Sequence, residues 1–516
     1  MKPYLDIYPS SDAGEIDEGF STGFSLDFMG GNNSYIARNH RSARERPEEV
    51  NAKISARLNK GIVAGPYDSP PFTHFRSSAI GLVEKSIPNT WRFIHDLSTY
   101  PKEDSVNQSI NPDSCSVQYT TLDQVVAKLA DCGKGANMFK ADIQSAFDLL
   151  PIRPQEYNLL GFSHQGKFYV NRVMAMGAAC SCQKFEKLST FLQWVIEHKS
   201  GYDSLAHYCD DFLGWGPLGT SQAEDLLALF VDTCQEFGVP IAHDKTVPPT
   251  TCLVFLGLTL DTERQEVRVP PDKLESTLAL IDNALNRPSF KITLSELQSL
   301  IGKLQFLCRA IAPGRAFVRR LTYLTRNVVN PRYYIRLTVG AKRDLLLWKT
   351  FLSEYNGVSM FRDMVWADTD SLDIFTDASF SAMGIYFMGH WVSQAWPHGF
   401  ISQDTSIAFL EIFPIAVLLV IWGKDIANRS IVFHVDNMSV VQCINRLSSA
   451  CPMIMRVIRF IVLKALHYNI ALKARHVPGK VNIADSLSRL DLKTFHKQAP
   501  HADVAPTTVP PSVWDI

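Results

Sequence analysis

Two neighbouring aspartates, Asp210 and Asp211, separate two largely apolar runs, Leu205-Ala-His-Tyr-Cys and Phe212-Leu-Gly-Trp-Gly. Apolar runs on either side of a short polar break, with glycines following, predict a β-hairpin with the acid pair at its tip. Adjacent carboxylates are costly to keep ionised unless a cation lies between them. The pair is therefore a candidate divalent-metal site, and a solvated acidic turn is the alternative.

A third carboxylate, Asp142, ends the strand-like run Met138-Phe-Lys-Ala-Asp, after which the chain turns through Ser145-Ala-Phe147. Phosphoryl transfer commonly uses two metal ions about 4 Å apart. Mg²⁺ takes oxygen ligands and keeps some of its waters, so two or three aspartates suffice when substrate phosphates complete the shell. Asp142, Asp210 and Asp211 together therefore indicate phosphoryl-transfer chemistry.

The order of these motifs, an aspartate followed by Ala-Phe and then a Tyr208-Cys-Asp-Asp hairpin, resembles the reverse transcriptases. The resemblance implies a right-hand polymerase with fingers, palm and thumb, in which Asp142, Asp210 and Asp211 hold two Mg²⁺ ions, with Mn²⁺ as an alternative. It also implies an RNA template, a DNA primer and dNTPs as partners.

Lys85 and Arg92 belong to a predicted hairpin over residues 79–98, and the resemblance implies that they clamp the incoming triphosphate. An ammonium and a planar guanidinium suit polyphosphate oxygens, although surface charges on a hairpin are the alternative. The resemblance further implies that Phe147 crowds the sugar 2′ position and that Lys245 donates a proton to pyrophosphate. Gly177, followed by small residues, would let backbone approach a base pair closely.

The segment Met174-Ala-Met-Gly177, then Ser181-Cys182 and Phe185-Glu186, departs from the usual family pattern of Pro-x-Gly followed by Ala-Pro. This variant is similar to the DIRS-like retrotransposons, whose enzymes end the motif with Phe-Glu. The sequence is therefore identified as resembling a DIRS-like reverse transcriptase/ribonuclease H polyprotein.

A second set of acids follows residue 365: Asp377 and Asp436 on strand-like runs, Glu411 on an apolar helix, and Asp485 in Asn482-Ile-Ala-Asp485. A buried carboxylate is costly without a partner, so four of them invite a shared pair of cations. Their order resembles the ribonuclease H fold, which implies two further Mg²⁺ ions and an RNA–DNA hybrid as substrate.

Two features of this region depart from the ribonuclease H pattern. His476 precedes the last acid at an unusual place and is given only a helper role. Pro414 lies three residues after Glu411, so the helix is expected to begin close to Glu411 or to kink.

The predicted fold class is α+β multidomain: a right-hand polymerase with fingers, palm and helical thumb/connection, followed by an α/β ribonuclease H-like domain. We divide the chain into a flexible N-terminal arm (1–45), fingers and palm (46–262), thumb/connection (263–365), a ribonuclease H-like domain (366–490) and a Pro-rich tail (491–516). Helices are expected at 273–286, 293–311 and 342–352.

The formal net charge of −1 does not by itself announce a nucleic-acid partner, but the charge is unevenly spread. Residues 303–349 hold eleven Lys and Arg against one acid, Asp344, with aromatic residues between them. Such a stretch favours contact with a phosphate backbone. A basic run at 38–60 fits either nucleic-acid contact or a solvated helix face.

The ten cysteines contain no Cys-x-x-Cys pair and are interpreted as reduced thiols, which favours an intracellular protein of the cytoplasm or nucleus. No signal peptide, membrane span or membrane partner is expected. Two alternatives remain open: a host-adopted, non-catalytic nucleic-acid-binding scaffold, and an RNA-dependent RNA polymerase of the same palm class. The complete carboxylate sets oppose the first, and Phe147 with the ribonuclease module opposes the second.

Overall fold

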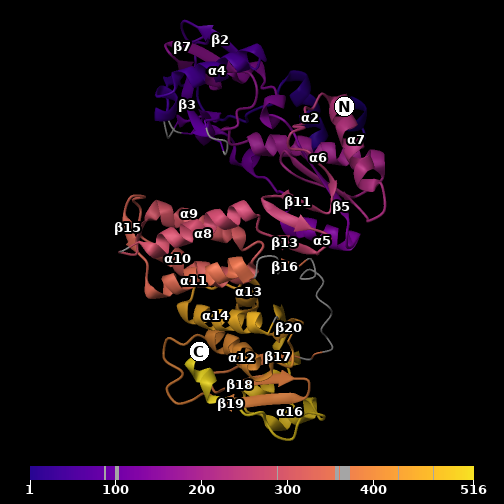
Figure 1. Cartoon of the computed structure of the whole chain (residues 1–516), viewed down its shortest axis with the longest axis vertical. Helices are drawn as coiled ribbons and strands as arrows, with labels where there is room; N and C mark the ends of the chain where they lie inside the picture. Colours follow the sequence, from indigo (N-terminus) through magenta and orange to yellow (C-terminus); the bar gives the residue numbers. More distant parts are fainter. Residues whose placement is uncertain are drawn as a thin grey trace. The chain divides into compact units, whose positions relative to one another are not determined.

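The computed structural model describes residues 1–85, 89–98, 104–287, 289–354, 359–360, 372, 374–427, 429–468 and 470–516. The chain divides into two compact units, Met1–Leu256 and Gly257–Ile516 (Figure 1). The division falls close to the predicted 262/263 boundary between palm and thumb/connection, and the second unit contains both the predicted thumb/connection and the ribonuclease H-like region. The predicted boundary between these two regions, at 365/366, stays a prediction. That boundary lies outside the described residues.

A sheet with strand order β1-β3-β6-β7-β2, in which β4 also pairs with β3, forms the predicted fingers. Helix α4 packs on this sheet because Val50 and Ile54 join a buried cluster with Ile80 and Phe162. The elements are β1 (Tyr35–Ile36), α3 (Arg41–Arg44), α4 (Pro47–Asn59), β2 (Val63–Tyr67), β3 (Arg76–Glu84), β4 (Trp91–Asp96), β6 (Gly161–His164) and β7 (Lys167–Asn171).

The second sheet of this unit, with order β10-β5-β9-β8, forms the predicted palm. Its apolar face is covered by α6 and α7, whose Phe185, Phe191 and Phe230 are fully buried beside Phe139 and Phe212. The elements are α5 (Leu122–Cys132), β5 (Asn137–Asp142), α6 (Ser181–Ser200), β8 (Leu205–Tyr208), β9 (Asp211–Gly216), α7 (Gln222–Phe237), β10 (Val247–Thr250) and β11 (Cys252–Phe255).

The N-terminal segment differs from the flexible arm that we expected for residues 1–45. It forms α1 (Lys2–Leu5) and α2 (Asp12–Thr22), and buries Leu5, Ile16 and Phe24 in the palm core. Phe24 forms a β-bridge with Ile152. A polar, Gly-rich composition concealed this order because the stabilising contacts come from residues far along the chain.

The second unit begins with a helical part. Among its described residues, helices α8, α9 and α11 lie close to where the periodicity predicted helices. Phe351 of α11 packs on Trp348 of its own helix and on Phe317 of α10, a helix that the periodicity had not singled out. The elements are β12 (Leu258–Asp261), β13 (Glu266–Arg268), α8 (Pro271–Asn286), β14 (Lys291–Thr293), α9 (Leu294–Leu307), α10 (Arg315–Leu324), β15 (Tyr334–Arg336), α11 (Val339–Glu354) and β16 (Ser359–Met360).

The ribonuclease H-like region is a five-stranded sheet with order β19-β18-β17-β20-β21 (Figure 1). Strands β17 to β19 are antiparallel, whereas β20 runs parallel to β17 and β21 parallel to β20. The elements are β17 (Ile374–Ala378), β18 (Ala382–Phe387), β19 (His390–Ala395), α12 (Ile407–Trp422), β20 (Ser430–Val435), α13 (Met438–Arg446), α14 (Pro452–His467), β21 (Ala471–His476) and α15 (Ala484–Ser488).

Helix α12 begins at Ile407, earlier than the start near Glu411 that Pro414 had suggested, and it continues through Pro414 to Trp422. Its first turn is capped by Ser406, whose side chain accepts a hydrogen bond from the Phe409 amide. The helix is apolar all round and buried from Phe409 to Leu419, so burial of its side chains offsets the backbone bond that proline removes.

The C-terminal tail also differs from the extended linker that we expected for residues 491–516. It contains α16 (Leu492–Gln498), and its Thr507 amide donates to the Trp391 carbonyl of β19 at 2.8 Å. Trp514 stacks on Phe413 of α12 with ring centroids 5.8 Å apart. The Pro-rich tail therefore packs on this sheet and on the helix that carries Glu411.

Candidate active sites

The palm sheet brings together the three aspartates that the sequence predicted. Asp142 ends β5 directly opposite Asp211, which begins β9. Asp210 lies in the two-residue turn between β8 and β9, and its carbonyl accepts a 3.0 Å hydrogen bond from the Ile143 amide. Residues 68 positions apart in sequence therefore meet at one end of two neighbouring strands, as phosphoryl transfer by this acid set requires.

Lysine side chains partly neutralise these aspartates. Lys245 Nζ lies 2.8 Å from Asp142 Oδ1, and Lys140 Nζ lies 2.9 Å from Asp211 Oδ1. Lys245 was predicted as a site residue, whereas Lys140 was not. The alternation of strand β5 could have identified Lys140, because residues 140 and 142 point to the same face.

Burial and mutual repulsion still disfavour the charged aspartates. Burial raises the pKa of Asp142 above its ordinary value, the hydrogen bond from Lys245 opposes the rise, and Asp210 and Asp211 add to it. Burial likewise raises the pKa of Asp210, with a further contribution from Asp211. The bond to Asp142 in turn raises the pKa of Lys245. Added positive charge at this edge would therefore be favourable.

The turn that carries Asp210 is fixed by α6. Cys209 has a left-handed backbone (φ 56°), which is unfavourable for a residue other than glycine. Its amide donates to Glu186 Oε2 at 3.1 Å, and its carbonyl accepts from Ser189 Oγ at 2.7 Å. The other oxygen of Glu186 lies 3.2 Å from His207 Nε2. The sequence had singled out Glu186 only as part of a motif, and the structure gives it a positioning role.

A cavity of about 560 Å³ opens over these acids and is shared with the fingers. Its wall includes Asp142 and Asp210 from the palm and the predicted phosphate ligands Lys85 and Arg92 from the fingers. Lys245 lines it too, as do Lys53, Arg57 and Lys60 from the basic run whose role we had left open. Acids and cations both line this cavity, and Arg57 pairs with Asp148 at 3.1 Å. Such a lining suits a triphosphate with bound metal ions.

The other two predicted palm residues lie in different surroundings. Phe147 lines the cavity and packs edge-to-face on Phe185 at 5.8 Å, so its ring is held at the site. Gly177 does not line the cavity, whose wall is formed there by Met176. A Cβ on Gly177 would lie 2.3 Å from the His95 carbonyl oxygen, so this glycine allows close packing against β4. Its proposed contact with a base pair stays a prediction.

The second acid set converges at the centre of the ribonuclease H-like sheet. The parallel register places Phe375 of β17 opposite His434 of β20, so Asp377 and Asp436, two residues further on, are neighbours. Glu411 faces them from α12, and its charge interacts with both. Gly384 of β18 allows α15 to pack closely on the sheet, because a Cβ at this position would lie 2.4 Å from the Ala484 carbonyl oxygen.

Helix α15 in turn brings Asp485 and Ser488 to the site. Ser488 Oγ donates a hydrogen bond to Asp377, and Arg489 Nε lies 2.9 Å from Asp485 Oδ1. The predicted helper His476 is exposed at the end of β21, where it pairs with Val435 beside Asp436. All four predicted acids of this region therefore share one locality.

Of these acids, Asp485 pairs with Arg489, whereas Asp377 and Glu411 face other acids. Burial raises the pKa of Asp377 to about 7 and that of Glu411 to about 8, and the charge of Asp436 adds to both shifts. Glu411 Oε2 and Asp436 Oδ1 are buried without a hydrogen-bond partner among the described residues. Free carboxylate oxygens that repel one another fit Mg²⁺, which prefers such ligands.

Within the described residues, no group of three His, Cys, Asp or Glu side chains has the geometry of a ready metal site. In the palm this agrees with the lysines that already contact Asp142 and Asp211. Carboxylate oxygens are ligands that Mg²⁺ prefers, so the donor chemistry of both acid sets fits the predicted ions. The side chains would have to adjust to bind them.

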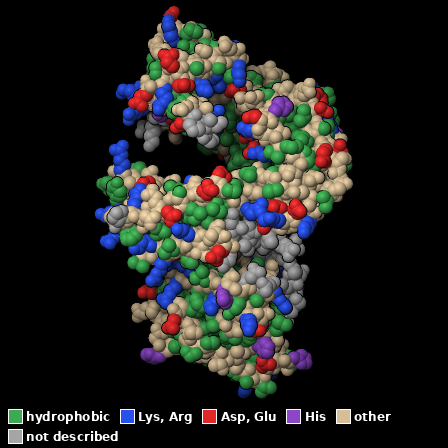
Figure 2. Space-filling view, viewed as in Figure 1, with side chains coloured by type: hydrophobic (Ala, Val, Ile, Leu, Met, Phe, Trp, Pro, Cys, Tyr) green, Lys and Arg blue, Asp and Glu red, His purple; other side chains and the backbone are tan. Residues whose placement is uncertain are grey.

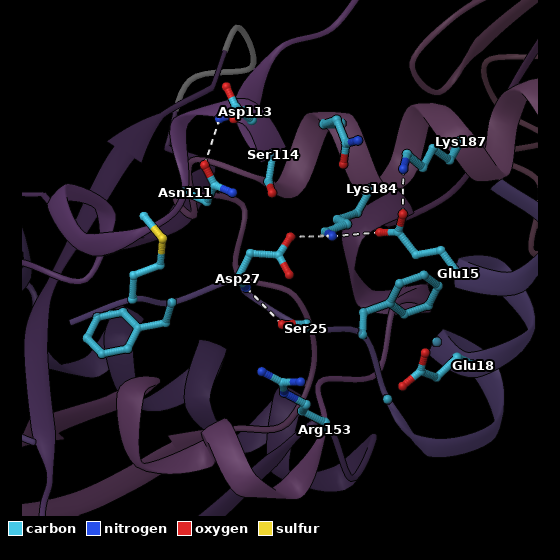
Figure 3. Close-up of a pocket in the computed structure, with 16 residues that line it drawn as sticks. Glu15, Glu18, Ser25, Asp27, Asn111, Asp113, Ser114, Arg153, Lys184 and Lys187 are labelled. Carbon is cyan, nitrogen blue, oxygen red and sulfur yellow. Dashed lines mark hydrogen bonds and ion pairs between the residues drawn. The ribbon is translucent and has the colours of Figure 1, made fainter. Parts of the chain in front are cut away.

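A further cavity, of about 700 Å³, lies where the N-terminal segment meets α6 (Figure 3). Lys184 is 5% exposed, and its Nζ lies 2.6 Å from both Glu15 Oε1 and Asp27 Oδ2. Lys187 pairs with Asp12 at 2.9 Å. These ion pairs tie the N-terminal segment to the helix that holds the Asp210 turn, so we interpret the cavity as part of that joint.

No protein-family model matches this chain. The chain is 23% identical over 210 residues to the enzymatic polyprotein of Cestrum yellow leaf curling virus, which covers 40% of this chain and 29% of that protein. It is 28% identical over 192 residues to protein P of duck hepatitis B virus (strain China), which covers 36% and 23%. The chain thus spans less than a third of either relative.

Solved structures show the fold over nearly the whole chain. The foamy viral protease-reverse transcriptase in complex with RNA/DNA hybrid matches with a TM-score of 0.51 and 14% identity, covering 99% of this chain and 64% of that one. The same protein in complex with dsDNA gives a TM-score of 0.52 and 14% identity, covering 92% and 96%. The chain therefore has the α+β, multidomain polymerase fold of these proteins.

Among the described residues, none of the helices combines the length and the apolar character that a membrane crossing requires. All ten cysteines are free thiols, as the sequence predicted.

Proposed function

We propose that this chain is an RNA-directed DNA polymerase with a fused ribonuclease H, which copies retroelement RNA into DNA and degrades the RNA of the hybrid. One observation carries the polymerase assignment. Asp142 and Asp210 line the same cavity as Lys85, Arg92 and Lys245, although these residues come from distant parts of the sequence. The similarity to viral polyproteins and to the reverse-transcriptase fold supports it.

The polymerase site would hold its metal ions on Asp142, Asp210 and Asp211. Mg²⁺, when bound, supplies charge that stabilises the attacking and leaving oxygens of an in-line displacement. Lys85 and Arg92 would bind the triphosphate of a dNTP, because guanidinium and ammonium groups suit phosphate oxygens. Lys245 would hold a proton for the departing pyrophosphate. Phe147, fixed against Phe185, would exclude a 2′-hydroxyl.

The ribonuclease site would use Asp377, Glu411, Asp436 and Asp485 as ligands. The unpartnered oxygens of Glu411 and Asp436 support this assignment. Ser488 orients the Asp377 carboxylate, and Arg489 orients that of Asp485. The RNA strand of a hybrid would be distinguished by its 2′-hydroxyls.

The finer assignment to DIRS-like elements rests on the Phe185-Glu186 motif and its neighbours. The contact of Glu186 with the catalytic turn gives that motif a physical function. The free cysteines support action in a reducing, intracellular compartment.

A non-catalytic nucleic-acid-binding scaffold is the second candidate, favoured by one observation. Lys245 and Lys140 already pair with Asp142 and Asp211, so the palm acids have a structural role that needs no metal ion. A scaffold of this kind would keep these ion pairs and bind hybrid without extending a primer.

Primer extension on an RNA template, with dNTPs and Mg²⁺, separates the two candidates. We expect wild type to extend the primer and Asp210→Asn to lose at least roughly 100-fold in rate, as when one preorganised active-site group is removed. Asp377→Asn is the matched control and should keep extension while losing cleavage of the RNA strand. Equal extension by wild type and Asp210→Asn would favour the scaffold.

A further inference from the structure

A small pocket of about 250 Å³ lies in the second unit, and none of the four ribonuclease acids lines it. Arg315 and Arg319 of α10 line it together with Arg446, the last residue of α13. The pocket thus joins the helical part of this unit to the ribonuclease H-like part. Figure 2 shows Lys and Arg side chains gathered over the helical part.

The three guanidinium groups converge without a compensating acid, since no Asp or Glu is among the residues that line the pocket. Arg319 Nε is buried and has no hydrogen-bond partner within the described ranges. An arginine nitrogen cannot lose its proton in a protein, so each of these groups stays charged. The pocket therefore concentrates positive charge.

The neighbouring arginine of the same helix shows the contrast. Arg320 pairs with Asp344 at 3.1 Å, and Asp344 is also 3.3 Å from Arg459 of α14. Asp344 is 2% exposed and is the one acid in residues 303–349. The one acid of this stretch, Asp344, thus pairs with Arg320 and Arg459 and does not neutralise the charge of Arg315 or Arg319.

The remaining wall is polar and neutral. Leu447 adopts a left-handed backbone (φ 48°) after α13, and the Ser448 amide then donates to the Cys443 carbonyl at 3.2 Å. This turn places Ser448 in the wall, which also includes Gln305 of α9. Burial raises the pKa of Cys308 to about 12, so this thiol stays uncharged. Hydroxyl and amide donors beside guanidinium groups suit an oxyanion with several acceptor oxygens.

We propose that this arginine pocket, formed by Arg315, Arg319 and Arg446, is a phosphate-binding site that holds a backbone phosphate of the bound nucleic acid. The inference rests on the proposed function, which supplies the nucleic acid. Guanidinium groups bind phosphate oxygens in a forked geometry, which a scattered basic surface does not provide. A phosphate held there contacts both the helices and the ribonuclease H-like part, and so fixes the strand relative to Asp377 and its partners.

The test compares two full-length variants that each remove three positive charges. Arg315→Gln/Arg319→Gln/Arg446→Gln alters the pocket, and Lys424→Gln/Lys493→Gln/Lys497→Gln alters exposed lysines of the same unit. The binding constant for an RNA–DNA hybrid is measured between 50 and 200 mM KCl, with thermal unfolding as a check on the fold. We expect the pocket variant to bind at least tenfold more weakly, with a salt slope smaller by about 1, as for loss of one phosphate contact.

Equal hybrid binding by the two variants would overturn the inference. So would a pocket variant that loses binding of inorganic pyrophosphate but keeps hybrid affinity and salt slope, since the ligand would then be a free polyphosphate. Wild-type primer extension is measured alongside. If wild type extends primers while the variants bind hybrid alike, the pocket inference alone fails; if wild type neither binds hybrid nor extends primers, the proposed function fails as well.

Discussion

The two acid sets of this chain balance their charge in different ways. In the palm, Lys245 and Lys140 lie within 3 Å of Asp142 and Asp211. In the ribonuclease H-like part, Asp377 and Glu411 face other acids, and burial raises their pKa values to about 7 and about 8. The palm site is thus partly neutralised by the protein, whereas in the second site Arg489 pairs with Asp485 and leaves Asp377 and Glu411 dependent on protons or bound cations.

The secondary structure explains this difference. The palm acids lie at the end of two neighbouring strands, beside a polar cavity. Strand alternation there places Lys140 on the same face as Asp142. Glu411 instead emerges from α12, a helix with apolar residues on every side. Apolar side chains do not neutralise a carboxylate, so Glu411 depends on a proton or on a bound cation. Fold stability and metal binding are therefore more tightly linked in the second site.

The largest effect expected from this difference is a pH-dependent stability of the metal-free protein. Asp377 and Glu411 bind protons in the folded state up to about pH 7 and 8, whereas their ordinary values are 3.8 and 4.5. Between these limits the folded state holds more protons than the unfolded state, so the free energy of unfolding falls as pH rises. At about 1.4 kcal/mol per unit, the loss should reach a few kcal/mol by pH 8.

Urea-dependent hydrogen exchange of peptides from β17 and α12, in EDTA at pH 5 to 8, measures this effect. Asp377→Asn and Glu411→Gln should each flatten the pH dependence, and Mg²⁺ should restore protection at pH 8. Protection that is constant over this range, or that rises with pH, would show that the acids of the second site are already compensated. The proposed contrast with the palm would then be lost.

A smaller effect is expected from Glu186, which makes the palm turn depend on protein contacts. Glu186→Leu removes the acceptor of the Cys209 amide, and an unsatisfied buried donor costs about 1–3 kcal/mol. We expect kcat for primer extension to fall about tenfold, with a smaller change in KM for dNTP. Glu186→Gln keeps an acceptor oxygen and should retain most of the rate.

Ribonuclease activity is the internal control for Glu186, because this residue lies in the other unit of the chain from Asp377. Both variants should cleave the RNA of a hybrid at the wild-type rate. Equal loss of primer extension in Glu186→Leu and Glu186→Gln would mean that the carboxylate charge, rather than the hydrogen bond to the turn, matters. No loss in either would remove the positioning role.

The acid residues and the sheets that carry them could be predicted from sequence because the relevant signals are local. Strand alternation around Asp142 and the apolar runs around Asp210 specify a hairpin and its neighbour. The N-terminal segment and the tail could not be predicted, because their order comes from partners far away in sequence, such as Lys184 for Asp27. Amino-acid composition indicates solubility and local propensity, but it does not indicate which distant residues a segment will pack against.

The two sites could be predicted only in part, because some of their residues depend on tertiary contacts. Acid types and their order identified both sets, yet Lys140 and Glu186 were missed as contributors. Their roles depend on which face of β5 or α6 meets the turn, and one residue of register changes that face. Gly177 packs against the His95 carbonyl, a contact that its small neighbours did not reveal, and its contact with a base pair stays a prediction.

Binding of Mn²⁺, followed by electron paramagnetic resonance in the presence of an RNA–DNA hybrid, tests the central claim that the chain holds two separate metal sites. We predict two classes of bound ion in wild type. Asp210→Asn should remove one class and leave the other, and Asp377→Asn should do the reverse. Loss of both classes in one variant, or wild type that binds no Mn²⁺, would contradict the account.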